Sequence, residues 1–189
     1  MTELDLHQRD QLPDALRVLL ADYPRDTWET DPGFEGTVRF WLDRHLMFRR
    51  ILGNLQSDAQ AIIDRKMPGK HYANALSRMG GMFVNGLHEH HTIEDTYYFP
   101  KLAVMDQRIT TGFDILDKDH HAIDAELNAF VGTANDILQR RDDDHQMRER
   151  AARFAAQLDG LHQLLDRHLT DEEELIVPVI LRYGAPAIG

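Results

Sequence analysis

The chain has 189 residues, of which 42% are apolar and 28% charged, and this length is enough for one well-buried core. Its formal net charge of -11 repels nucleic acids and anionic membranes, so we expect neither as a partner. Cysteine is absent, which excludes disulfides, thiolate catalysis, zinc–thiolate sites and iron–sulfur clusters. The first ten residues lack the regions of a signal peptide and no apolar run is long enough to span a membrane, so we expect a cytoplasmic protein.

Residues 1–34 predict a short helix and a loop that pack on the domain behind them. The helix is expected from Pro13 to Ala21, because proline suits the first helical turn and Tyr23-Pro24 supplies a stop. The remainder, up to residue 34, is expected to form a loop over one end of the following helices.

Four long stretches follow in which apolar residues recur at steps of three and four, as in an amphipathic helix. The stretches are residues 38–62, 76–94, 113–130 and 154–172. Breaks are expected at Met67-Pro68-Gly69, before Pro100, at Thr111-Gly112 and in a charged turn at 140–144. Because alternating apolar and polar residues are rare, the sequence predicts an all-α, up-down four-helix bundle over residues 35–182 and a flexible tail at 183–189.

Each of the four predicted helices carries one histidine within its apolar face. These histidines are His45, His90, His120 and His168. A buried histidine needs a hydrogen-bond partner or a metal ion. In an up-down bundle, residues equally far from a turn lie at one level, because the rise of about 1.5 Å per residue cancels. The predicted turns lie midway between successive histidines, so we expect the four imidazoles in one layer.

Two of these histidines lead a glutamate by four residues and a proline by ten. His90 precedes Glu94 and His168 precedes Glu172, and this spacing places each pair on one helical face. Two carboxylates in an apolar layer are unfavourable unless cations offset their charge. Imidazole and carboxylate without sulfur, in a helical bundle, form the ligand set of di-iron and di-manganese sites. Zinc also fits, whereas calcium and magnesium favour all-oxygen ligands.

With these motifs the sequence resembles the hemerythrin-like family, the HHE cation-binding domain, over about residues 35–182. The resemblance rests on Arg44-His45-Leu46, His90-x-x-x-Glu94 with Tyr98-Phe99-Pro100, Asp119-His120-His121-Ala122-Ile123 and His168-x-x-x-Glu172. It implies two non-haem iron ions with a bridging oxo or hydroxo group, manganese or zinc being less favoured. By this resemblance Glu94 and Glu172 would bridge the ions, His45 and His90 would bind one iron, and His120 and His168 the other.

The chain departs from the family pattern at two positions. Invertebrate hemerythrins have a second histidine one turn after the first on the third helix, and here that position is Asp124. Some members take a ligand from the residue next to the second-helix histidine, which here is His91. His91 is therefore the first candidate for a seventh ligand, with a solvated or hydrogen-bonded histidine as an equal alternative, and Asp124 is the second. Trp41 and Tyr98 are expected behind the ligands, in the wall that limits solvent.

The acidic runs at 142–144 and 171–174 are expected to form mostly turns and helix N-termini, where negative charge is favourable. Glu172 is set apart from its run by its register with His168.

The leading functional hypothesis is a protein that binds or turns over a small oxidant, namely dioxygen, hydrogen peroxide or nitric oxide. Carrier, catalase-like and other oxidoreductase interpretations share the same site, so the sequence leaves open both enzyme activity and the existence of a protein partner. The alternative is an iron- or oxygen-sensing regulatory module whose bundle is stabilised by metal. A metal-free structural bundle is the third interpretation, and the alignment of four histidines at one level opposes it.

Overall fold

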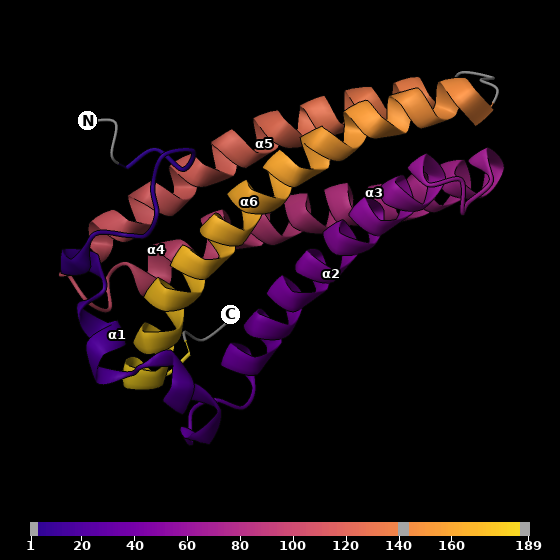
Figure 1. Ribbon diagram of the computed structural model, residues 1–189. Helices are drawn as coiled ribbons and strands as arrows, with labels where there is room; N and C mark the ends of the chain where they lie inside the picture. Colours follow the sequence, from indigo (N-terminus) through magenta and orange to yellow (C-terminus); the bar gives the residue numbers. More distant parts are fainter. Residues whose placement is uncertain (1–3, 140–143, 186–189) are drawn as a thin grey trace. The chain divides into compact units, whose positions relative to one another are not determined.

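The computed structural model describes residues 4–139 and 144–185, and throughout these residues the regular secondary structure is helical (Figure 1). The all-α class predicted from the sequence is confirmed. The charged turn predicted at residues 140–144 lies outside the described residues except for residue 144, which begins a helix. Of the tail predicted at residues 183–189, the part from residue 186 onward also lies outside them. None of the helices described is both long enough and apolar enough to cross a membrane.

Four long helices carry most of the described chain. They are α2 (Thr37–Ile63), α3 (Gly69–Ile93), α5 (Thr110–Gln139) and α6 (Asp144–Tyr183). Each contains one of the apolar stretches predicted from the sequence, apart from the last residue of the second stretch. The predicted break between the first two also holds, because α2 ends at residue 63, Arg65 adopts a left-handed φ of 61°, and Pro68 precedes α3.

The helical run that begins with α3 does not end before Pro100, so that part of the prediction was wrong. The chain makes a π-helical turn at Glu94–Tyr98 and then the short helix α4 (Phe99–Leu102). In the π turn the N–H of Phe99 donates to the carbonyl of Glu94, five residues earlier. Pro100 lies in the first turn of α4, where a missing N–H is tolerated. Single π turns inside helices are frequent at functional sites.

The acidic run at residues 171–174 also differs from its prediction. It lies in the interior of α6, where Asp171, Glu172 and Glu173 are buried, and not at a turn or a helix N-terminus. These carboxylates are buried because arginine and histidine side chains from other segments contact them.

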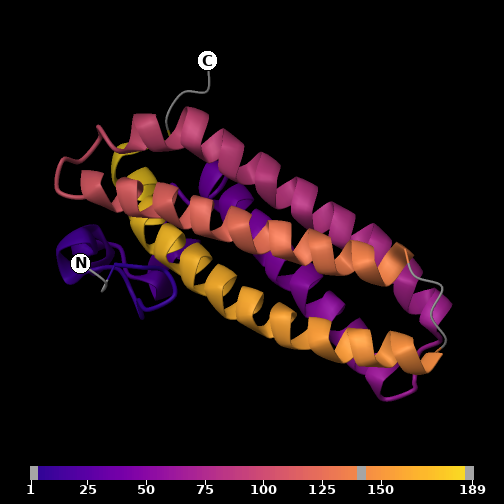
Figure 2. The same ribbon diagram turned by 90° about the horizontal axis from the view of Figure 1, so that it is seen from above.

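The N-terminal segment is less regular than the single helix expected. It forms a 3-10 turn at Asp14–Leu16, the short helix α1 (Val18–Asp22) and a second 3-10 helix at Arg25–Thr30, which lies within the expected loop. Leu16 at the end of the 3-10 turn and Leu19 in α1 are both buried. Figures 1 and 2 both show this segment beside the C-terminal part of α6.

The contacts of the chain define two units, each described here by itself. The first comprises residues 1–46, 90–122 and 165–189, and the second comprises 47–89 and 123–164. In the second unit, three phenylalanine rings in a row connect α3, α5 and α6. The ring centroids of Phe83 and Phe130 lie 5.9 Å apart, and those of Phe130 and Phe154 lie 5.2 Å apart. The first unit contains an aromatic and aliphatic core, which continues up to a group of buried histidines and carboxylates.

Candidate metal centre

Seven residues that the sequence singles out as metal ligands lie buried in the first unit. They are His45 of α2, His90 and His91 of α3, Glu94 at the start of the π turn, His120 of α5, and His168 and Glu172 of α6. Their ligand atoms form two groups, within each of which the atoms lie no more than 4.8 Å apart. The two-histidine cluster contains His45 and His90 with both glutamates, and the three-histidine cluster contains His91, His120 and His168.

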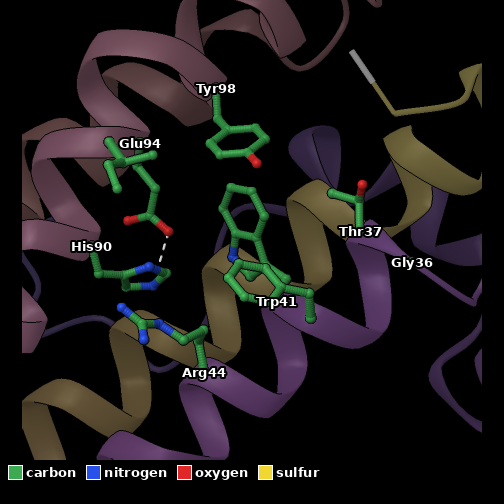
Figure 3. Close-up of a pocket in the computed structure, with 9 residues that line it drawn as sticks. Gly36, Thr37, Trp41, Arg44, His90, Glu94 and Tyr98 are labelled. Atoms are coloured by element: carbon green, nitrogen blue, oxygen red, sulfur yellow. Dashed lines mark ion pairs between the residues drawn. The ribbon is translucent and has the colours of Figure 1, made fainter. Parts of the chain in front are cut away.

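Glu94 directs its two carboxylate oxygens to different clusters. Oε1 lies 2.9 Å from Nε2 of His90, the contact marked in Figure 3, and Oε2 lies 3.6 Å from Nε2 of His120. A carboxylate in this position can give one oxygen to each of two cations.

Glu172 is divided in the same way. Its Oε1 lies 3.4 Å from Nε2 of His45, and its Oε2 lies 3.4 Å from Nε2 of His168. The two glutamates therefore face the same two clusters, as expected of a pair of bridging carboxylates. In addition, His45 and His90 point their Nε2 atoms at each other across 3.0 Å.

Three of the histidines donate their other ring nitrogen to a carboxylate on a neighbouring helix. Nδ1 of His45 lies 2.9 Å from Oε1 of Glu173, and Nδ1 of His120 lies 2.8 Å from Oδ1 of Asp95. Nδ1 of His168 lies 3.4 Å from Oδ2 of Asp119. Such contacts fix the tautomer and the ring orientation, so that Nε2 is left for a metal ion.

None of these three carboxylates is predicted at the site from the sequence, although a signal for them exists. Each is the immediate sequence neighbour of a predicted ligand: Asp95 follows Glu94, Asp119 precedes His120, and Glu173 follows Glu172. Consecutive residues of a helix point about 100° apart, so the neighbour of an inward ligand can reach the histidine on the next helix.

His91 differs from the other histidines in having no hydrogen-bond partner at either nitrogen among the described residues. Its ring is 3% exposed and is stacked on that of His120, with centroids 3.9 Å apart and an interplanar angle of 9°. Burial and the neighbouring imidazoles hold the pKa of His91 well below its usual value, so the ring is neutral, as a ligand must be. Its role as a seventh ligand stays a prediction.

The ionisable groups of the site influence one another because they are buried together. Burial, reinforced by the charge of Glu172, raises the pKa of Glu94 well above its usual value. Burial alone would raise the pKa of Glu172 too, but His45 and His168 hold it well below. Burial likewise lowers the pKa of His168, yet Asp119 and Glu172 outweigh it and raise that pKa to about 9. Bound cations would replace the protons that the site otherwise holds.

Several buried atoms that face the clusters have no hydrogen-bond partner within the described residues. They are both nitrogens of His91, both oxygens of Glu94, Nε2 of His120, Nε2 of His168 and Oε2 of Glu172. Unpaired buried polar atoms are rare in proteins, and a group of them facing one another is the arrangement that metal ions satisfy. The residues present therefore fit a cation at each cluster.

A cavity of about 520 Å³ adjoins the two-histidine cluster (Figure 3). His90 and Glu94 line one part of it, and the aromatic rings of Trp41 and Tyr98, 4.6 Å apart and nearly perpendicular, form part of its wall. The indole N–H of Trp41 also donates to Oε1 of Glu172 over 2.5 Å. Trp41 and Tyr98 thus lie beside the predicted ligands His90 and Glu94, and their role in limiting solvent stays a prediction.

Asp124, the second candidate for an additional ligand, belongs to neither cluster. It lies in the second unit, is half-buried, and lines a small pocket with Asn85 and His88.

Comparison with known families gives one match. Residues 36–180 match the hemerythrin HHE cation binding domain. The chain belongs to this family. The resemblance inferred from the motifs is thereby confirmed, and the HHE domain contains every residue of the two clusters. No curated protein and no solved structure matches the chain. Membership of the family and the two histidine–glutamate clusters together indicate that this HHE domain binds metal cations.

Proposed function

We propose that the HHE domain forms an up-down four-helix bundle that holds two iron ions, one at each histidine cluster, and binds or turns over a small oxidant. Glu94 and Glu172 would bridge the ions together with an oxo or hydroxo group. The observation that carries the proposal is that each glutamate directs one oxygen to each cluster. A site for a single ion would have no use for two carboxylates divided in this way.

The two ions would have unequal sets of protein ligands. The three-histidine cluster offers three imidazoles, and one oxygen of each glutamate faces it; the two-histidine cluster is likewise faced by one oxygen of each glutamate but has one imidazole fewer. An external molecule needs an open coordination position. The cavity adjoins His90 and Glu94, and none of its lining residues belongs to the three-histidine cluster. We therefore assign oxidant binding to the two-histidine cluster.

Iron would supply the one- and two-electron chemistry that no side chain of this site can perform. The chain's own residues have other tasks. Trp41 orients Glu172 through its indole N–H, and the aromatic wall of the cavity limits solvent. The guanidinium of Arg44 lies near His90 in the same cavity, where it favours negative charge on a bound oxidant (Figure 3).

The proposal is tested by preparing the protein anaerobically with ferrous iron and measuring the iron content of each chain. Dioxygen, hydrogen peroxide and nitric oxide are then added in separate samples while the visible spectrum is recorded. We expect about two ions per chain, as in other dinuclear carboxylate bundles, and a spectral change with at least one oxidant. Less than about one ion per chain after reconstitution would overturn the di-iron assignment.

The same experiment separates an enzyme from a carrier. Sustained oxygen release from hydrogen peroxide identifies catalase-like turnover, whereas a spectrum that reverses when dioxygen is removed identifies a carrier. Parallel reconstitution with manganese and with zinc tests the choice of metal, because zinc has no redox chemistry and should give no spectral response.

A further inference from the structure

The N-terminal segment, residues 4–34, reaches the three-histidine cluster through Arg9. The side chain of Arg9 is almost fully buried, with 5% of the residue exposed. Its Nη2 donates to Oδ2 of Asp119 over 2.5 Å, its Nη1 lies 3.3 Å from Oδ1 of the same carboxylate, and its Nε donates to Asp171 over 2.8 Å. The carboxylate of Asp119 is the one that accepts from Nδ1 of His168. Arg9 is therefore linked to the predicted ligand His168 through the carboxylate of Asp119.

Arg25 makes the equivalent connection to the two-histidine cluster. Its Nη1 donates to Oε2 of Glu173 over 2.7 Å, and Oε1 of Glu173 accepts from Nδ1 of His45 over 2.9 Å. The pair is less enclosed than that of Arg9, because 46% of the Arg25 side chain is exposed. The chain thus has two arginine–carboxylate–histidine series, one leading to each cluster.

A third arginine of the segment makes a similar pair that leads to no candidate ligand. Nε of Arg17 donates to Oε2 of Glu174 over 3.0 Å. Glu174 follows Glu173 on α6, and its described contacts include none of the predicted ligands. Arg17 therefore provides a matched control, an N-terminal arginine that pairs with a carboxylate of α6 but is not linked to a predicted ligand.

We propose that Arg9 and Arg25 are positioning residues for the metal pair, Arg9 for the three-histidine cluster and Arg25 for the two-histidine cluster. The proposal rests on the proposed function, since it requires two bound cations. Both arginines lie before residue 36, where the family match begins, so they stand outside the part of the chain that the HHE domain covers. Each arginine holds a carboxylate in place, and that carboxylate keeps the imidazole turned so that Nε2 faces the cluster.

The two arginines should differ in strength. Arg9 meets Asp119 with two nitrogens in a buried setting, whereas Arg25 meets Glu173 with one nitrogen and is partly open to solvent. Exposed ion pairs are weaker than enclosed bidentate ones. The coupling is also reciprocal, so metal binding should hold the N-terminal segment more firmly against α6.

The test uses the full chain with cobalt(II) as the probe, because its visible spectrum depends on coordination and needs no oxidant. The variants are Arg9→Gln, Arg25→Gln and the control Arg17→Gln, each checked for helical content before metal is added. Stepwise titration against a competing chelator gives the affinity of each ion. A chymotrypsin time course with and without cobalt then reports how firmly residues 4–34 are held, because its sites at Tyr23, Trp28 and Phe34 are the same in all variants.

We expect the first, tighter ion to bind at the three-histidine cluster. Its affinity should fall about 10- to 100-fold in Arg9→Gln, the range typical for residues that support a metal ligand. Arg25→Gln should lower the affinity for the second ion several-fold, and Arg17→Gln should leave both unchanged. Cobalt should slow cleavage within residues 4–34 of the wild type and of Arg17→Gln, but not of Arg9→Gln.

Two results would overturn the proposal, and they are distinguishable. If the wild type binds two cobalt ions and all three variants bind them equally well, Arg9 and Arg25 have no positioning role. If the wild type itself binds no pair of ions, the proposed metal pair fails together with this inference. Should Arg9→Gln lose its helical content, Arg9→Lys and Asp119→Asn replace it. Lysine keeps the charge but loses the bidentate contact, so partial recovery of affinity is expected.

Discussion

The two histidine clusters share both glutamates, yet their surroundings are opposite. At the two-histidine cluster, His90 and Glu94 line a cavity of about 520 Å³. At the three-histidine cluster, the ring of His120 is stacked on that of His91, with centroids 3.9 Å apart. It also packs against the buried ring of Phe99, with centroids 5.4 Å apart. One cluster is therefore accessible and short of ligands, while the other is enclosed and rich in them. This difference is the reason why we propose reaction at the first cluster and structural support at the second.

The two copies of the His-x-x-x-Glu motif differ in a related way. Glu172 lies within the continuous helix α6, whereas Glu94 begins the π turn. In the first copy the residue after the histidine is His91, and in the second it is Leu169. The motif copy His90-x-x-x-Glu94 therefore contributes His91 to the three-histidine cluster, and its His90 and Glu94 also line the cavity.

The largest effect is expected from removing a bridge. Glu94→Ala and Glu172→Ala should each lower the content of both ions, because each carboxylate faces both clusters. We expect occupancy to fall from about two ions per chain to well below one, measured by metal analysis after gel filtration. Glu174→Gln, two residues from Glu172 on α6, is the control and should keep its metal. Selective loss of one ion in either alanine variant would contradict the bridging assignment.

The next largest effect is expected from replacing His91, because His91 gives one cluster a third histidine while the other has two. His91→Ala should remove one imidazole from the three-histidine cluster and so make the two ions bind with similar affinity. The loss at that position should exceed the 10- to 100-fold typical of residues behind a ligand, and stepwise cobalt titration measures it. His88→Ala, on the same helix but in the second unit, should have no such effect. An unchanged first affinity in His91→Ala would mean that His91 is not a ligand.

Much of the fold and of the site could be predicted from the sequence, because both depend on spacing. The steps of three and four in the apolar residues predicted the four long helices, and the equal distances of His45, His90, His120 and His168 from the turns predicted one layer. Distances of about 3 Å between atoms of His45 and His90 agree with that layer. Helical periodicity is local, and a single sequence contains it.

The remaining features depend on which segment meets which in space. Nothing in the spacing of Arg9 reveals that it reaches Asp119, 110 residues away. The burial of Asp171 is also not predictable from the sequence, because the partners that explain it, the Arg9 side chain and the backbone N–H of Leu12, lie about 160 residues earlier in the chain. The π turn is not predictable from the sequence, because proline commonly follows the end of a helix but here occupies the first turn of a new one.

A smaller effect should follow when the access route is narrowed. Ile93, which lines the cavity next to Glu94, is replaced in Ile93→Trp so that the indole fills part of the space. Iron content should stay the same while oxidation of the ferrous protein slows about tenfold, equivalent to a barrier higher by about 1.4 kcal/mol. Stopped-flow absorbance after mixing with hydrogen peroxide measures the rate. The control Val104→Trp adds the same bulk at an exposed position outside the cavity lining. Equal rates in both variants would show that the oxidant does not use this cavity.

The smallest effect is expected from the hydrogen bond between Trp41 and Glu172, which lies on the two-histidine side. Trp41→Phe keeps an aromatic ring in the cavity wall but removes the N–H that donates to Oε1, the oxygen facing His45. In the metal-bound site the cations offset the charge of Glu172, so this hydrogen bond is worth about as much as one between neutral groups, about 0.5 to 1.5 kcal/mol, and the affinity of the ion at the two-histidine cluster should fall roughly 2- to 10-fold. Oε2 faces His168 and keeps its place, so the other ion should change less.

Trp28→Phe is the matched control for this variant. Trp28 is equally buried and donates its indole N–H as well, but to the carbonyl of Tyr23, and it contributes to neither cluster. Both variants remove one buried hydrogen bond, so a general loss of stability should affect them alike in thermal unfolding without metal. A change of cobalt affinity confined to the second ion and to Trp41→Phe would show that the hydrogen bond tunes the accessible position. An equal fall in the affinity of both ions would instead mean that losing the hydrogen bond at Oε1 displaces the whole carboxylate of Glu172. The difference between the clusters would then depend only on His91 and the cavity.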